Sequence, residues 1–71
     1  MSEWRRVLKA LEELEWRGSR QTADYVAALI GRDAASVGRM LEAAQRQGYV
    51  ERVSQEWWLT DRGRAQARDP D

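Results

Sequence analysis

The chain has 71 residues, with 12 basic and 12 acidic side chains, and it contains neither cysteine nor histidine. These absences exclude disulfides, thiolate metal sites and the commonest general base, so we expect no metal, no cofactor and no enzymatic activity. Zero net charge argues against a strong, indiscriminate binder of nucleic acid, whose domains are usually basic. The apolar runs are short and interrupted by charges, which predicts a cytoplasmic protein without a membrane span or signal peptide.

A first helix is expected to begin after Ser2 as its N-cap and to end at Gly18-Ser19. Its apolar residues Trp4, Val7, Leu8, Leu11 and Leu14 recur at helical spacing and form one stripe. Glu13 and Arg17 are spaced for a favourable i,i+4 ion pair. Trp16 falls well outside the apolar stripe, so this face of the helix does not explain it.

Two further helices are expected, joined by a turn of about three residues that is typical of a helix-turn-helix. Thr22 and Asp33 are their N-caps, and Gly31 and Gly48 end them. We expect apolar contacts from Tyr25, Val26, Leu29 and Ile30 in the second helix, and a buried stripe of Val37, Met40, Leu41 and Ala44 in the third.

After Gly48 the pattern changes to β-strands, because "YVERV" and "EWWLT" are rich in β-branched and aromatic residues. A turn of about three residues around Ser54-Gln55 is expected to join them as a hairpin. Thr60 then caps a last short helix from Asp61 to about residue 68, which Gly63 weakens. The order α-α-α-β-β-α predicts a single α+β domain over residues 1–68, followed by a polar tail at 69–71.

Two stretches carry a family resemblance. The first is "TADYVAALIGRDAASVGRMLEAAQRQGYVER" (residues 22–52), including its ending "QGYVER", and the second is "WLTDRGRA" (residues 58–65). Both resemble the winged helix-turn-helix domains of MarR-like and related bacterial and archaeal regulators. The resemblance implies that the third helix enters the major groove of double-stranded DNA, while the hairpin forms a short wing on the backbone or minor groove. It also places Leu59 in the core. Trp57 then shares that inner face of its strand and Trp58 faces away.

Mapped onto this chain, the resemblance makes the outer face of the third helix the DNA-reading surface. Arg39 would pair with a guanine edge or a phosphate, and small side chains would permit close approach. The candidates on this helix are Ala35, Ser36, Arg39, Ala43 and Arg46; Arg32 in the preceding turn and Arg52 and Gln55 in the wing could contact phosphate or the minor groove. A solvated surface carrying a few arginines is the alternative, and Glu42 supports it because it would repel phosphate.

Other features have two interpretations. Gly38 costs about 0.8–1.0 kcal/mol of helix propensity relative to alanine, which either close packing on the second helix or close approach of DNA would justify. Arg20 and Gln21 could touch a phosphate, although the interpretation without such a contact is favoured. Three arginines of the last helix, Arg62, Arg64 and Arg68, could follow the DNA backbone, or could simply balance the helix dipole, which is the safer interpretation.

The sequence therefore predicts a small sequence-specific DNA-binding protein, a transcriptional regulator associated with the nucleoid when bound. Two tryptophans outside the core, Trp16 and Trp58, suggest a contact surface for a homodimer or another protein, because tryptophan is enriched at interface hot spots. The alternative is a winged-helix protein-interaction module that does not bind DNA, in which Trp16 and Trp58 are the anchors.

Overall fold

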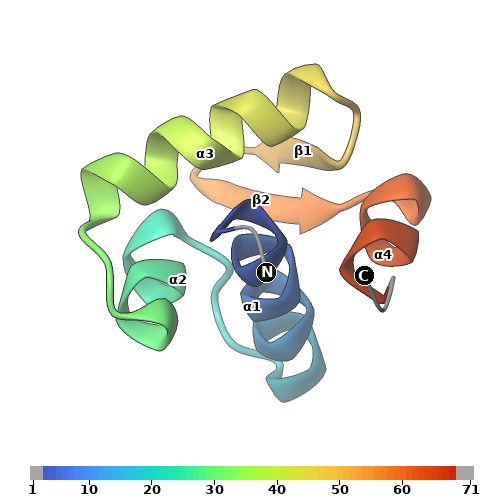
Figure 1. Ribbon diagram of the computed structural model, residues 1–71. Helices are drawn as coiled ribbons and strands as arrows, with labels where there is room; N and C mark the ends of the chain where they lie inside the picture. The colour runs from blue at the N-terminus through green and yellow to red at the C-terminus, as the bar shows by residue number, and fades with distance from the viewer. Residues whose placement is uncertain (1–2, 69–71) are drawn as a thin grey trace.

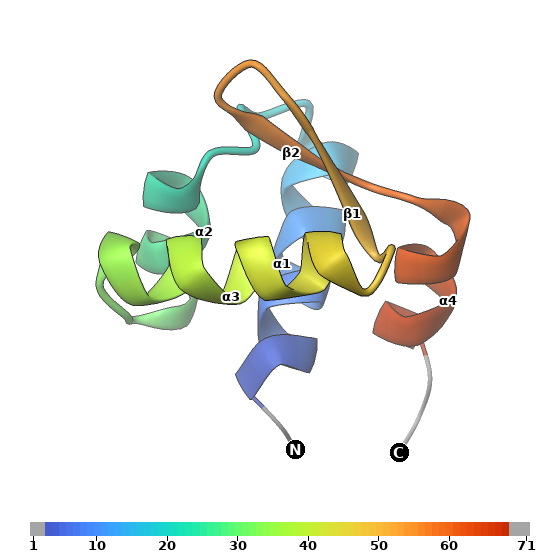
Figure 2. The same cartoon turned by 90° about the horizontal axis from the view of Figure 1, so that it is seen from above.

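The computed structural model describes residues 3–68. They form, in chain order, α1 (Glu3–Arg17), α2 (Ala23–Ile30), α3 (Ala34–Arg46), β1 (Val50–Val53), β2 (Glu56–Leu59) and α4 (Asp61–Arg68). This α+β order of three helices, a hairpin and a last helix confirms the order predicted from the sequence. Helices α2 and α4 lie on opposite sides of α1, and α3 crosses it (Figure 1; Figure 2). The predicted cap at Ser2 and the tail at 69–71 lie outside the described residues.

Local capping contacts fix where α2 and α3 begin and where α2 ends. The Thr22 hydroxyl accepts a hydrogen bond from the Tyr25 backbone N–H at 3.3 Å, and the Asp33 carboxylate accepts one from the Ser36 N–H at 2.8 Å. Both satisfy N–H groups that a helix start leaves without an internal partner. Gly31 ends α2 in the left-handed region at φ 71°, which glycine adopts at no steric cost. The predicted caps of both helices are confirmed.

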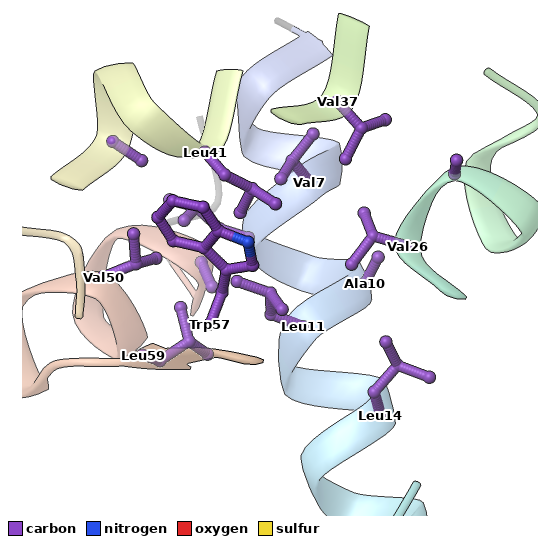
Figure 3. Packing of buried hydrophobic residues seen from close by; sticks show 14 residues of the cluster. Val7, Ala10, Leu11, Leu14, Val26, Val37, Leu41, Val50, Trp57 and Leu59 are labelled. Atoms are coloured by element: carbon purple, nitrogen blue, oxygen red, sulfur yellow. The ribbon is translucent and has the colours of Figure 1, made fainter. Parts of the chain in front are cut away.

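The core lies where α1 meets α3 and the inner face of the hairpin. The Trp57 indole, only 5% exposed, lies among Leu11, Leu41 and Val50 (Figure 3). Burying a leucine or valine side chain fully is worth about 1.5–3 kcal/mol, so this cluster is the main source of stability. The buried apolar residues are Val7, Leu8, Ala10, Leu11, Leu14, Val26, Ala27, Val37, Leu41, Ala44, Val50, Trp57, Leu59 and Ala67.

Helix α2 turns Val26 and Ala27 inward. Val26 is fully buried and Ile30 packs against the core, as expected, whereas Tyr25 is 47% exposed and Leu29 is 40% exposed. Nearly every residue of this eight-residue helix is apolar, so periodicity could not show which stripe turns inward or that Ala27 belongs to it.

The hairpin is antiparallel, with Val50 opposite Leu59 and Arg52 opposite Trp57. The Ser54-Gln55 turn has two residues rather than the expected three, because residue 56 already belongs to β2. Ser54 has φ 61°, so a residue other than glycine occupies the left-handed region at the tip. Trp57 is buried and Trp58 is 38% exposed, which confirms the predicted alternation along β2.

The start of α4 packs closely on Gly48 and Tyr49, in the connection between α3 and β1. The Thr60 hydroxyl donates to the Gly48 carbonyl at 2.7 Å and accepts from the Gly63 N–H at 3.0 Å, while the Thr60 N–H donates to the Tyr49 carbonyl at 3.0 Å. A Cβ at position 63 would overlap that same Tyr49 carbonyl and lie 3.1 Å from a Leu59 methyl. Gly63, expected only to weaken α4, is therefore what permits its approach.

Candidate functional site

The outer face of α3 carries the polar side chains that the sequence singled out. Arg39 and Arg46 are exposed, as is Ala35, whereas Ser36 and Ala43 are half-buried at the edges of this face. Arg39 makes one long contact, from Nη2 to the Ser36 hydroxyl at 3.5 Å. For Arg46 the described residues provide no hydrogen bond or ion pair. Both guanidinium groups therefore keep most of their donors directed at solvent.

The start of α3 has a negative charge held in place by its own backbone. The Ser36 N–H, and secondly the Ser36 hydroxyl, lower the pKa of Asp33 below its usual 3.8. The carboxylate is thus ionised at neutral pH and occupies the helix N-terminus, where backbone N–H groups would otherwise attract an anion. Arg32 precedes it in the turn and is exposed; its backbone N–H bonds to the Ala27 carbonyl at 3.0 Å.

A polar hollow of about 320 Å³ lies between the start of α2, the middle of α3 and the hairpin. It brings together residues from three parts of the chain. Thr22 and Asp24 come from α2 and its cap, Gly38 and Glu42 from α3, and Arg52 and Gln55 from the hairpin. The hollow contains charges of both signs, so it could accept hydrogen bonds from amino groups and donate them to phosphate, but it is not a uniformly basic cleft.

Gly38 borders this hollow, and nothing lies within 4 Å of where its Cβ would be. Close packing on α2, one of the two reasons considered for this glycine, is therefore excluded. The other reason concerns the open space that the absent side chain leaves on the side of α3 that faces the hairpin. The folded domain itself has no need of a glycine at this position.

The hairpin candidates are partly engaged within the hairpin. Arg52 Nε donates to the Ser54 carbonyl at 3.0 Å, and its guanidinium carbon lies 5.3 Å from the centroid of the Trp57 ring. This cation–π contact holds the charge at the edge of the hollow. Gln55 is exposed at the tip. The structure thus brings Arg52 and Gln55 to the same hollow as Gly38 and Glu42 of α3. The predicted α3 candidates do not line this hollow; they are Ala35, Ser36, Arg39, Ala43 and Arg46.

The two tryptophans proposed as anchors are both exposed, but on different elements. Trp16 on α1 is 87% exposed. Trp58 lies on the outer face of β2, opposite Glu51, and Val53 on the neighbouring strand is 59% exposed. No ring contact joins Trp16 to Trp58 within the part of the chain that the structure describes.

Two arginines of α4, which the sequence analysis left to the DNA backbone or the helix dipole, are paired with α1 instead. Arg64 Nη2 donates to both carboxylate oxygens of Glu15 at 2.7 and 2.6 Å, and Nη1 donates to the Leu59 carbonyl at 3.2 Å. These bonds to Glu15 raise the pKa of Arg64 above its ordinary value. Arg68 pairs with Glu12 at 2.9 Å. Both cations are therefore committed to α1, across 49 and 56 residues of sequence, and no local pattern could have shown it.

Two other side chains near the site differ from simple surface residues. Gln21 is only 2% exposed, so the phosphate contact that the sequence analysis considered but did not favour is excluded. Its carbonyl accepts from the Trp57 N–H at 2.8 Å, which attaches the α1–α2 connection to β2. Arg62 lies over the Tyr49 ring at 5.1 Å, and Tyr49 in turn contacts Trp4, with ring centroids 5.0 Å apart.

Within residues 3–68 no helix has the length and apolar content that crossing a bilayer requires. The same residues contain no cluster of three or more side chains suited to ligating a metal ion. Neither a scan against protein-family models nor a search of curated proteins finds a match to the chain.

Proposed function

We propose that the chain is a winged helix-turn-helix domain that binds double-stranded DNA and serves as a transcriptional regulator. The observation that carries the proposal is the juxtaposition of the α2 start, α3 and the hairpin around one hollow. Winged-helix proteins present a recognition helix and a wing to DNA from one side in this way. Here α3 would enter the major groove and the hairpin would lie over the adjacent backbone.

The available donors support distinct roles. Arg39 has only a long contact to Ser36, so it can turn to a guanine edge without losing a strong bond. Ser36 would read a neighbouring base. Arg32, Arg46 and Arg52 would hold phosphates, and the open space beside Gly38 would admit the DNA surface closely.

The acidic side chains set the expected strength of binding. Asp24 and Glu42 border the hollow and oppose phosphate there, so the affinity of one copy for DNA is expected to be modest. Sequence-specific regulators commonly overcome this by binding two half-sites as dimers. A glutamate can also accept a hydrogen bond from the amino group of cytosine. Glu42 would then contact a base from α3, although it opposes phosphate.

The test is a titration of the isotope-labelled chain with a mixed-sequence duplex, followed by backbone amide shifts. Shifts at residues 32–46 and 52–56 that fade as salt rises are expected, because phosphate contacts release counterions. Arg39→Ala should weaken binding without unfolding the protein, whereas Lys9→Ala, which removes an equal charge from α1, should not. No shifts at high duplex excess, or equal effects of both variants, would contradict the proposal.

A protein-interaction role is the second candidate, favoured by the exposure of Trp16 and of the neighbouring Trp58 and Val53. Tryptophans that anchor an interface lose their exposed area when the partner binds. Substituting both tryptophans by alanine would then lower the mass of the protein in solution from dimer to monomer. An unchanged mass, together with intact duplex binding, would leave the DNA-binding role alone.

A further inference from the structure

Helices α1 and α2 form an apolar groove on their outer side. Two open hollows, of about 300 and 380 Å³, lie along it, and Leu29 lines both. Ala10 and Ile30 contribute to the first; Leu14, Tyr25 and Ala28 contribute to the second. None of these residues belongs to the hollow beside α3, so the groove is a separate surface.

The composition of α2 indicates that this groove is covered in the working protein. Asp24 is the only charged residue in the helix and lies at the hollow beside α3, so the exposed residues of α2 that line this groove, Tyr25, Ala28 and Leu29, are all uncharged. Tyr25 and Leu29 are 47% and 40% exposed there. A surface helix normally turns polar residues to water, and a helix that is apolar on all sides is normally buried. The exposed face of α2 therefore has the character of a contact surface.

The charges on the α1 edge of the groove restrict what can cover it. That edge carries Arg6, Lys9, Glu13 and Arg17. Glu13 is neutralised by Arg17 at 2.7 Å, while Arg6 has only a contact to the Ile30 carbonyl at 3.4 Å. Lys9 has no ion pair among residues 3–68. The edge therefore has a net charge of +2 (three cations less one carboxylate), and it favours an acidic occupant.

A second copy of the chain fits this edge poorly. A two-fold dimer through this groove would place the edge against its own copy, so a net charge of +2 would face an equal net charge. Such a contact brings an excess of like charge into a partly desolvated interface. Nucleic acid fits no better, because the floor of the groove is apolar and offers few donors to phosphate.

We infer that the α1–α2 groove binds an acidic amphipathic helix of another protein. Its apolar side chains would occupy the hollows on either side of Leu29, and its carboxylates would face Arg6 and Lys9. The α1 segment from residue 6 to residue 17 is about 16 Å long at 1.5 Å per residue, which matches about three turns of such a helix. The inference goes beyond the proposed DNA contact and does not depend on it.

The experiment is a selection of random 12-residue peptides displayed on phage, with the full chain immobilised, followed by affinity measurement on the enriched peptides by fluorescence anisotropy. We expect enrichment of peptides with large apolar residues at helical spacing and a net negative charge. Leu29→Ser should weaken these peptides about tenfold, as removal of an interface anchor does. Lys9→Glu should lower the affinity of the peptides through charge alone, so its effect on the affinity should become smaller at high salt.

Arg46→Glu is the matched control, since it makes the same charge reversal on α3 and should leave peptide affinity unchanged. Leu29 and Lys9 are both exposed, so neither variant should unfold the domain, which thermal melting would check. Enrichment of basic peptides, no enrichment, or peptide affinity unaffected by Leu29→Ser would overturn the inference. Leu29→Ser should leave duplex binding intact. Peptide binding and duplex binding are therefore measured independently, and a failure of this inference can be distinguished from a failure of the proposed DNA contact.

Discussion

Helices α3 and α4 each contain one glycine, and the two glycines have opposite surroundings. At Gly63 a side chain would overlap the Tyr49 carbonyl, whereas at Gly38 nothing lies within 4 Å. Each glycine lowers helix propensity relative to alanine, but only at Gly63 does close packing explain why a larger residue is absent. A glycine in a helix is thus explained by the surroundings of its absent side chain. For Gly38 these surroundings are a hollow open to solvent.

The arginines of the same two helices differ in a parallel way. Arg64 and Arg68 of α4 are bound to Glu15 and Glu12 of α1, so their charges serve the fold. Arg39 and Arg46 of α3 leave their donors in water. The difference separates a helix that holds the domain together from one whose outer face remains available for a ligand.

The largest expected effect is that of Gly63→Ala. The added methyl group overlaps backbone rather than a movable side chain, so α4 must shift away from the end of α3. Overpacking of this kind costs about 1–3 kcal/mol of unfolding free energy. Urea denaturation of the variant would measure it, and a loss below about 0.5 kcal/mol, the usual scatter of surface substitutions, would show that the contact is not tight.

Breaking the ion pair between Arg64 and Glu15 should have the next largest effect. Both side chains are about one third exposed or less, and Nη2 of Arg64 bonds both carboxylate oxygens of Glu15, so we expect a coupling of about 1 kcal/mol. A double-mutant cycle with Arg64→Gln and Glu15→Gln would isolate it. Arg46→Gln is the control from α3 and should leave the unfolding free energy within about 0.5 kcal/mol.

Gly38→Ala should change stability in the other direction. With no clash to accommodate, alanine raises the unfolding free energy by about 0.8–1.0 kcal/mol through helix propensity. If α3 lies against DNA as proposed, the same methyl group should weaken duplex binding. A variant that is more stable and binds duplex equally well would remove close approach of DNA as the reason for this glycine.

The smallest effect concerns the start of α3 at low pH. The pKa of Asp33 is lowered in the folded state by the Ser36 N–H, so the unfolded chain binds the proton more tightly. This contribution to stability is complete above the unfolded pKa and is lost as pH falls through the folded one. NMR titration of the Asp33 carboxyl should give a pKa below 3.8, and Asp33→Ala should remove this part of the acid sensitivity.

Much of the fold follows from local signals in the sequence. Thr22 and Asp33 are caps whose partners lie three residues away, and alternation along β2 separates Trp57 from Trp58. The same reasoning could not show that Tyr25 and Leu29 would be so exposed, because a short helix with a single charged residue contains little contrast from which its inner face can be identified.

The candidate site could be predicted only in part, for a similar reason. The exposure of Arg39 and Arg46 follows from the periodicity of α3. The inclusion of Asp24 in the same hollow does not, because it requires α2, α3 and the hairpin to be placed in three dimensions. The bond between Arg64 and Glu15 was likewise out of reach, since 49 residues separate its partners.

The ion pairs between α1 and α4 also determine when the domain can close during its synthesis. Glu12 and Glu15 leave the ribosome early, but their partners Arg68 and Arg64 are among the last of the described residues to follow. Trp57, the largest side chain in the core, is also made late. The first three helices must therefore keep an incomplete interior until the hairpin and α4 have emerged, so folding is expected to be completed only after residue 68 has left the ribosome.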